Sequence, residues 1–233
     1  MRIIDLSQEI HNGMRQRLFP GPVPSVFDIQ IRVTPSYEVV DDCCILQNHL
    51  GTHVDAPRHY SPASGLALHQ IPLECLITEA VVLDLRGKKP RSEIAIADLE
   101  QALISANEKI GAGDGIVLWV GMGQSYAGWT HDTWWESDYG GAPYLGENAV
   151  RWLADRRIAV LGIDAIAPDS AADRFAHRIL LKEHGVPIIE NLCNLEALAR
   201  SRVLLIALPA KVVGASGFPV RAVAIEDYGS GGG

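Results

Sequence analysis

Five short apolar runs, rich in β-branched residues, constrain the fold of this chain more than any other feature. Each run is four to eight residues long, which is typical of buried β-strands rather than helices. The runs are Thr78–Leu85, Gly115–Val120, Ile158–Ile163, Val186–Ile189 and Val203–Leu208. Because segments with helical spacing lie between several of them, we expect an α/β or mixed α+β fold.

The predicted helices fill the spaces between these strands. They are Ile96–Lys109, Gly146–Arg156, Ala171–His184 and Asn194–Ala199. Further strand candidates in the first half of the chain are Ile3–Ile10, Val26–Val33 and Cys43–His49. Ser170 and Asp173 suit the start of the third helix, and Gly185 suits its end.

No repeat, and no linker rich in proline, serine or charge, divides the sequence. The only low-complexity segment is the glycine-rich stretch over residues 229–233. We therefore expect one domain over residues 1–228, followed by a flexible tail over residues 229–233.

Charge and hydropathy exclude several classes of partner. The chain has 20 Lys and Arg residues against 28 Asp and Glu, a net charge of −8, which disfavours nucleic-acid partners. No apolar run is long enough to span a bilayer, so we expect no membrane partner. Asp5 interrupts the N-terminus before any signal-type apolar region, and we expect a cytoplasmic protein.

Three of the eight histidines fall within eleven residues, in the segment HLGTHVDAPRH. In an extended segment, residues separated by even offsets share one face. The side chains of His49, His53, Asp55 and His59 would then project together, away from the core. Gly51 and Pro57 oppose a helical HExxH arrangement. This spacing favours a functional cluster over a set of unrelated surface histidines.

Imidazole and carboxylate groups in this combination are typical ligands of Zn²⁺, Mn²⁺ or Fe²⁺. If two ions bind, two more ligands are needed. His177 lies in a predicted helix, and Glu190 follows an apolar strand, where a carboxylate is costly unless it is paired or metal-bound. Each of these two residues, considered alone, is equally compatible with a structural role.

The run from His49 to His59 resembles the signature His-x-Gly-Thr-His-x-Asp-x-Pro-x-His of the putative cyclase family. That family includes bacterial kynurenine formamidases and manganese-dependent isatin hydrolases. All seven fixed positions of the signature are present. Other similar segments are Ile4–Ser7, Gly65–Leu73, Gly162–Asp164, Ile189–Leu192 and Gly217–Arg221.

The resemblance implies a role for each residue of the cluster. His49, His53 and Asp55 would bind one metal ion, and Asp55 would bridge to a second ion held by His177 and Glu190. The cofactor would be Zn²⁺ or Mn²⁺, with one or two ions per subunit. The implied fold is a swivelling β/β/α domain, normally assembled as homodimers or homotetramers.

The implied activity is hydrolysis of a C–N bond other than a peptide bond. His59 would transfer protons while a water molecule attacks a small amide, as in an arylformamidase. A lactam or lactone hydrolase of the isatin type, and a polyketide-type cyclase, would use the same metal. We also retain two other classes: a metal-binding or small-ligand-binding protein without catalysis, and a hydrolase that uses Cys43 or Cys44.

An aromatic segment between Tyr126 and Tyr144 departs from the formamidase pattern. It contains Trp129, Trp134 and Trp135, which we expect, together with Phe19, to contact a planar or aromatic carbonyl substrate. A contact between subunits, or packing of the segment on its own domain, would explain the same aromatic residues. The exact substrate is therefore left open.

Overall fold

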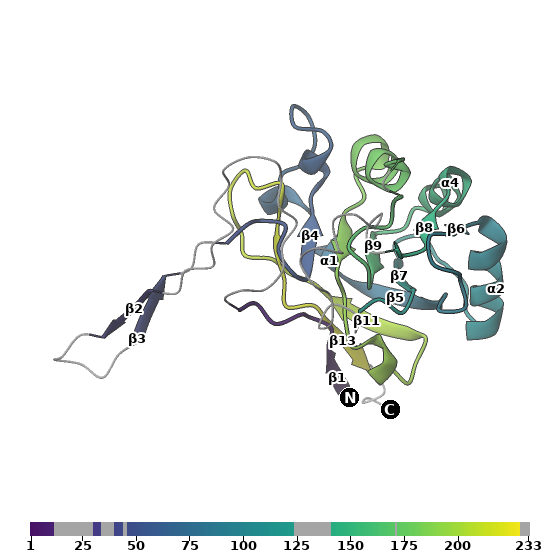
Figure 1. The fold of residues 1–233 in the computed structure, drawn as a ribbon, viewed down its shortest axis with the longest axis horizontal. Helices are drawn as coiled ribbons and strands as arrows, with labels where there is room; N and C mark the ends of the chain where they lie inside the picture. Colours follow the sequence, from purple (N-terminus) through teal and green to yellow (C-terminus); the bar gives the residue numbers. More distant parts are fainter. Residues whose placement is uncertain (12–29, 34–39, 44–45, 124–140, 171, 229–233) are drawn as a thin grey trace.

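The computed structural model describes residues 1–11, 30–33, 40–43, 46–123, 141–170 and 172–228 (Figure 1). Most of these residues build one mixed sheet of nine strands, in the order β1-β13-β11-β5-β7-β9-β10-β4-β12. The strands are β1 (Arg2–Asp5), β4 (His53–Asp55), β5 (Ile77–Asp84), β7 (Gly115–Trp119), β9 (Val160–Ile163), β10 (Ile188–Glu190), β11 (Arg202–Ile206), β12 (Gly217–Pro219) and β13 (Val223–Glu226).

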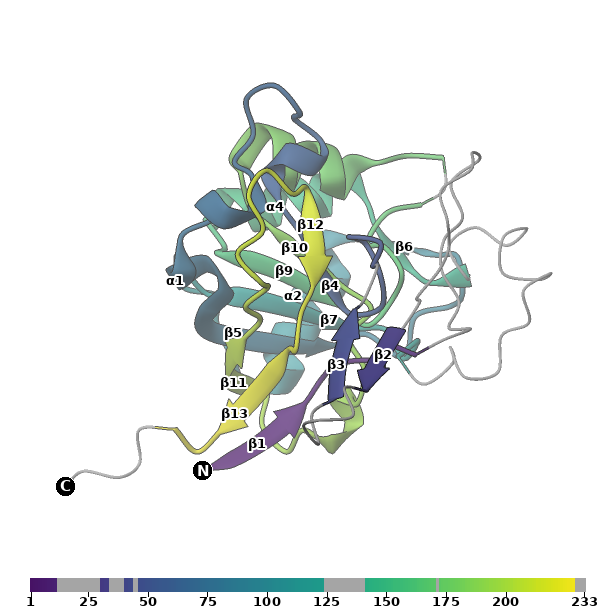
Figure 2. The same cartoon turned by 90° about the vertical axis from the view of Figure 1, so that its left-hand side faces the viewer.

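The centre of the sheet is parallel and both of its ends are antiparallel. The four strands β5, β7, β9 and β10 run parallel to one another, as the buried apolar runs suggest. The strand β11 joins antiparallel to β5 at one end, and β4 joins antiparallel to β10 at the other. Figure 2 shows β4 and β12 at the end of the sheet opposite to β1 and β13.

Apolar side chains cover both faces of this sheet. On one face, Leu83, Leu118 and Ile163 belong to a buried cluster that includes residues of α2 (Ile96–Ala106) and α4 (Glu147–Asp155). These two helices lie on the same side of the molecule in Figure 1. The shorter helical elements are α1 (Leu73–Leu76), η1 (Pro57–His59), η2 (Leu68–Gln70), η5 (His177–His184) and η6 (Leu195–Ala197).

The second face carries its own cluster, in which Val54, Val117 and Ile189 are buried. Two small two-stranded sheets are separate from the main one in their hydrogen bonding. They are formed by β2 (Gln30–Val33) with β3 (Val40–Cys43), and by β6 (Glu93–Ile94) with β8 (Tyr144–Leu145).

Local sequence explains where the principal helices begin and end. The Asp98 carboxylate accepts the Ala95 N–H at the start of α2, and Asn107 ends this helix in the left-handed conformation at φ 52°. The helical conformation that leads into η5 begins at Phe175 rather than at the predicted residue 171. The reason is Asp169, whose carboxylate accepts the first free N–H groups of this helix.

The predicted α/β class and all five apolar strands are confirmed. The predicted helix over Asn194–Ala199 is wrong, because this segment forms only the short turn η6. The predicted strand Ile3–Ile10 is shorter in the structure, where β1 ends at Asp5. The strands β12 and β13 were not predicted.

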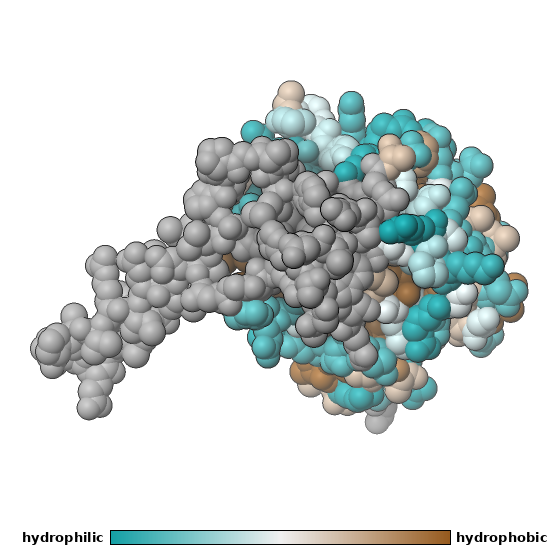
Figure 3. Space-filling view, in the orientation of Figure 1, coloured by the Kyte–Doolittle hydropathy of each residue, from teal (hydrophilic) through white to brown (hydrophobic). Residues whose placement is uncertain are grey.

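The surface is consistent with the charged composition. In the view of Figure 3, the described residues are mainly hydrophilic, and hydrophobic ones are scattered among them. None of the helices in the described ranges has the length and apolar character needed to cross a membrane.

Candidate metal centre

The centre of the histidine-rich segment is β4, which lies between β10 and β12. His53 is opposite Glu190 in the antiparallel register with β10, and Val54 is opposite Ile189. Because side chains alternate along a strand, His53, Asp55 and Glu190 share one face of the sheet. Val54 and Ile189 pack into the core on the other face. The alternation places two carboxylates and an imidazole side by side.

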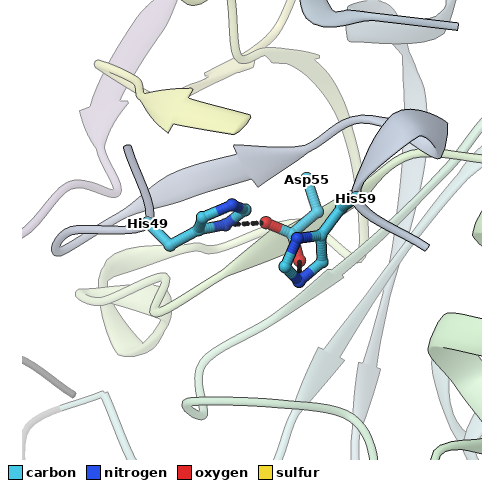
Figure 4. Close-up of side chains that lie close together, drawn as sticks. All are labelled: His49, Asp55 and His59. Atoms are coloured by element: carbon cyan, nitrogen blue, oxygen red, sulfur yellow. Dashed lines mark hydrogen bonds and ion pairs between the residues drawn. The ribbon is translucent and has the colours of Figure 1, made fainter. Parts of the chain in front are cut away.

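Only part of the predicted extended segment is a strand. His49 lies in a bend before β4, and His59 lies in the helical turn η1, which begins at Pro57. The expectation that a continuous strand face aligns all four side chains is therefore wrong. The bend and the turn nevertheless direct His49 and His59 back toward Asp55, as Figure 4 shows.

Two glycines provide the space for this arrangement. Gly51 adopts φ 56°, a left-handed conformation that glycine tolerates best, and this turns the chain between His49 and β4. A Cβ atom at Gly217 of β12 would lie 2.6 Å from Cε1 of His49. A side chain at residue 217 would therefore clash with the imidazole of His49 in the position where it contacts Asp55.

Asp55 is the centre of the cluster, and its two carboxylate oxygens face different residues. His49 Nδ1 lies 2.6 Å from Asp55 Oδ1, and His53 Nε2 lies 3.3 Å from the same oxygen. His177 Nε2 lies 3.3 Å from Asp55 Oδ2, and His59 Nε2 lies 3.9 Å from it. The four imidazoles thus divide into two pairs, one for each oxygen.

The two carboxylate oxygens of Glu190 also face different imidazoles. Its Oε2 lies 3.5 Å from His53 Nε2, and its Oε1 lies 3.5 Å from His177 Nε2. His177 comes from the helix η5, and Glu190 ends β10, so residues far apart in the sequence meet at β4. The structure therefore brings together all six histidine and carboxylate residues that the sequence singled out.

Three of the imidazoles are held by a second contact that faces away from Asp55. His53 Nδ1 lies 2.9 Å from the Gly51 carbonyl, and His49 Nε2 lies 3.1 Å from Ser216 Oγ. His177 Nδ1 makes a very short contact with Oδ2 of Asp169. In each ring, one nitrogen is anchored and the other faces the carboxylates.

Sequence reasoning missed Ser216 and Asp169. For Asp169, a signal was available: an aspartate eight residues before His177, near the predicted start of the same helix, is a common N-cap. Ser216 offered no such signal, because its contact with His49 depends on long-range pairing of β12 with β4.

The cluster strongly shifts the protonation of its members. Burial alone would raise the pKa of Asp55, but hydrogen bonds with the surrounding imidazoles, that of His177 foremost, hold this pKa well below its usual range. Burial likewise disfavours the charged form of His53, yet Asp55 and Glu190 raise its pKa to about 9. Burial and the nearby imidazoles lower the pKa of His59 to about 4, against the opposing effect of Asp55.

The residues of this cluster fit a metal ion. Glu190 Oε1 is buried and accepts no hydrogen bond among the residues that the structure describes. Burial and the charge of Asp55 raise the pKa of Glu190. Donor atoms of His49, Asp55 and His59 lie within 4.8 Å of one another, and so do those of His53, Asp55 and Glu190. A cation there would offset the buried negative charge and give Glu190 a partner.

Several predicted residues lie outside the described ranges. These are the substrate-contacting candidates Phe19, Trp129, Trp134 and Trp135, and also Cys44. Nothing is described of the Cys43 side chain either. Of the cysteines that are described, Cys75 and Cys193 are free thiols. Burial raises the pKa of the Cys193 thiol to about 11, which opposes formation of a nucleophilic thiolate.

Known proteins with similar sequences or folds support the resemblance. The family model described as putative cyclase matches residues 4–170. A kynurenine formamidase from Erythrobacter litoralis is 31% identical over 227 residues, which are 97% of this chain and 94% of that protein.

Two solved structures share the fold. An isatin hydrolase bound to the product analogue thioisatinate superposes with a TM-score of 0.79 at 22% identity, over 95% of this chain and 91% of its own. A chain from Bacillus stearothermophilus, described as a predicted metal-dependent hydrolase, has a TM-score of 0.67 at 26% identity, over 96% of this chain and 97% of its own. Together with the family match and the formamidase relative, this fold places the chain in the putative cyclase family.

Proposed function

We propose that this protein is a metal-dependent hydrolase that cleaves the C–N bond of a small amide. The observation that carries the proposal is the meeting of four imidazoles and two buried carboxylates at β4, with one oxygen of Glu190 left without a hydrogen bond among the described residues. A cluster with this donor chemistry is suited to a divalent cation. The kynurenine formamidase relative, similar along nearly the whole chain, supports the reaction class.

The two oxygens of Asp55 suggest how ligands would be shared between two ions. His49 and His53 lie on the Oδ1 side, whereas His177 and Oε1 of Glu190 lie on the Oδ2 side. Asp55 would bridge the two positions. We propose Zn²⁺ or Mn²⁺, because a mixed nitrogen and oxygen donor set suits both.

His59 is the proposed proton-transfer residue. Its side chain is 26% exposed, against 4% for His53 and 6% for His177, so it is the imidazole of these three that a substrate could approach most readily. When bound at this centre, a divalent cation polarises a substrate carbonyl and acidifies water. His59 would accept the proton released during attack and return it to the leaving nitrogen. His59 Nε2 lies 3.9 Å from Asp55 Oδ2, so this ring stands beside the proposed metal positions.

For the substrate, we propose an aromatic formamide such as N-formylkynurenine, in keeping with the formamidase relative. A cyclic amide such as isatin is the second candidate, because ring opening breaks the same kind of bond with the same groups. Phe19, Trp129, Trp134 and Trp135 stay proposed substrate contacts.

The test is hydrolysis by the purified protein after removal of metal and again after its return. We expect the chelated protein to be inactive on N-formylkynurenine, formanilide and isatin, and we expect Zn²⁺ or Mn²⁺ to restore turnover of at least one of them. His59→Ala should retain its metal but lose about 100-fold or more in kcat, a typical contribution of general acid–base catalysis. The matched control is His184→Ala, which alters an exposed histidine at the end of η5.

Other outcomes would identify the alternative classes. Metal retained without turnover of any amide, lactam or ester would favour a binding protein. Activity that survives chelation and is lost on thiol alkylation would favour a cysteine hydrolase. Either result would overturn the proposed function.

A further inference from the structure

Asp169 is a buried carboxylate that is not among the expected metal ligands. It lies between β9 and η5, and it is 3% exposed. Its Oδ1 accepts the N–H of Ala176 at 2.6 Å, and its Oδ2 accepts the N–H of His177 at 3.3 Å. The same Oδ2 contacts Nδ1 of the His177 ring. One carboxylate therefore both caps the helix and holds the imidazole that the helix carries.

This contact determines which ring nitrogen of His177 can face the cluster. A carboxylate only accepts hydrogen bonds, so Nδ1 must carry a proton. The unprotonated lone pair of a neutral His177 is then on Nε2, which lies 3.3 Å from Asp55 Oδ2 and 3.5 Å from Glu190 Oε1. A metal ligand needs this lone pair.

The anchors of the other two rings are weaker. His53 is held by the carbonyl of Gly51 and His49 by the hydroxyl of Ser216, both of which are neutral. Only His177, among these three rings, is held by a charged group. An anionic partner both fixes a ring and increases its basicity, which strengthens its bond to a cation.

We propose that Asp169 is a positioning residue that keeps Nδ1 of His177 protonated and thereby secures the metal ion on the Oδ2 side of Asp55. The inference rests on the proposed function, because it assumes that a metal binds. It adds that the two metal positions differ, since one depends on a charged residue that is not itself a ligand.

The substitution Asp169→Asn tests whether the carboxylate of Asp169 keeps Nδ1 of His177 protonated, because it changes the hydrogen-bonding groups and hardly changes the size of the side chain. An amide has one accepting oxygen and one donating NH₂ group, whereas the carboxylate accepts on both of its oxygens. If the amide oxygen keeps the Ala176 N–H, the NH₂ group faces Nδ1 of His177 and favours the tautomer with the proton on Nε2. If the amide is flipped, its NH₂ group meets the N–H of Ala176 instead. The variant therefore cannot satisfy both contacts.

The measurement is metal affinity, by competition with a chromogenic chelator, on wild type and Asp169→Asn loaded with Zn²⁺. We expect the variant to hold one zinc ion about 10- to 100-fold more weakly, the usual effect of losing such a partner, and to hold the other nearly as wild type does. Ser170→Ala is the matched control, because it removes the Ser170 contact with the Asp173 N–H in the same loop without touching His177. It should bind zinc as wild type does.

A second readout reports the hydrogen bond between His177 and Asp169 directly. Long-range proton–nitrogen NMR of the zinc-loaded wild-type protein should show the His177 proton on Nδ1, with its proton resonance shifted far downfield by the bond to the Asp169 carboxylate. This measurement needs no variant: a proton on Nδ1 without that shift would show that zinc alone, and not Asp169, places it there. A proton on Nε2, or a variant that loses thermal stability yet keeps both zinc affinities, would overturn the inference. If the wild-type protein binds no zinc at all, the proposed function fails instead.

Discussion

Each half of the nine-stranded sheet contains a buried glutamate, and the two carboxylates differ in how many hydrogen-bond donors surround them. Glu226 in β13 is 2% exposed, and its Oε1 accepts the N–H groups of Ala199 and Arg200 at 2.6 and 2.8 Å. Its Oε2 accepts a hydrogen bond from Nη1 of Arg2 at 3.0 Å. Glu190 in β10 is 6% exposed, and its Oε1 accepts no hydrogen bond among the described residues.

The comparison distinguishes a structural carboxylate from one available for chemistry. Glu226 is surrounded by donors fixed by the fold, so its charge is compensated without any added group. Glu190 faces another carboxylate and two imidazoles, and its compensation is incomplete without a cation. Burial of a charge is thus not in itself a sign of function; the sign is burial without enough donors.

The largest expected effect comes from Glu190→Gln. The amide removes the charge that would hold one metal ion, so we expect this ion to be lost. We expect kcat to fall by more than about 100-fold, because losing only a residue that supports a metal ligand already costs about 10- to 100-fold in activity. The metal-free variant should be at least as stable as metal-free wild type, because a neutral amide is buried at no ionisation cost, whereas burial and Asp55 disfavour the charged form of Glu190. Metal analysis, turnover and thermal unfolding of both proteins measure the three quantities.

One outcome for Glu190→Gln would contradict the distinction between the two glutamates. A Glu190→Gln protein that retains full metal content and activity, but unfolds much more easily, would behave as a structural glutamate does. Glu190 and Glu226 would then not differ in kind.

The second expected effect concerns how the free energy of unfolding changes with pH, with and without bound metal. In the metal-free protein, burial and the neighbouring carboxylate charge raise the pKa of Glu190, and nearby carboxylates raise that of His53 from 6.5 to about 9 despite its burial. The folded state then binds more protons than the unfolded chain. The free energy of unfolding of the metal-free protein should therefore fall as pH rises from 6.5 to about 9, the interval between the unfolded and folded pKa values of His53.

Metal binding should flatten or reverse this slope, since ligands must release their protons to bind a cation. Urea unfolding across the interval, with and without saturating metal, measures both slopes. Equal slopes in the two series would show that His53 and Glu190 keep the same protons in both states, contrary to the proposed centre.

A smaller effect is expected at the structural end of the sheet. Glu226→Gln places an NH₂ group among groups that only donate, so we expect a loss of about 1–3 kcal/mol in the free energy of unfolding. Activity per folded molecule and metal content should be unchanged. Loss of metal from this variant, measured on the folded fraction, would show that the two ends of the sheet are coupled.

The smallest effect is expected for Arg2→Ala. The Arg2 side chain is 52% exposed, and such ion pairs contribute about 0–1 kcal/mol. The two backbone N–H groups should still hold Glu226 in place. A loss of several kcal/mol in chemical unfolding would show that Arg2, rather than the backbone, compensates this carboxylate.

Much of the fold could be predicted because its central strands are continuous apolar runs. The segments that became β5, β7, β9, β10 and β11 are each long enough to show this pattern. By contrast, β12 includes a glycine and a proline, and β13 alternates Val223 and Ile225 with an alanine and a glutamate instead of forming a continuous β-branched run. These segments become strands because long-range pairing with β4, β11 and β1 fixes them, which their local sequence does not reveal.

The candidate site shows the same division between local and long-range information. The spacing of His53 and Asp55 was sufficient to place these two side chains together, because β4 puts residues two apart on the same face. His49 reaches them through a bend before the strand, and His59 through a turn after it. Asp169 and Ser216 are brought in by the ends of other elements. The anchors of a site are harder to predict than its central groups because they depend on tertiary contacts.

Asp55 is proposed to bridge two metal ions, with one ion bound at each of its carboxylate oxygens. Anomalous diffraction from crystals of the zinc- or manganese-loaded protein, recorded at the absorption edge of the metal, tests it most directly. We predict one peak beside Oδ1 with His49 and His53, and a second beside Oδ2 with His177 and Glu190. Full metal occupancy with no anomalous peak within coordinating distance of Asp55 would contradict the account.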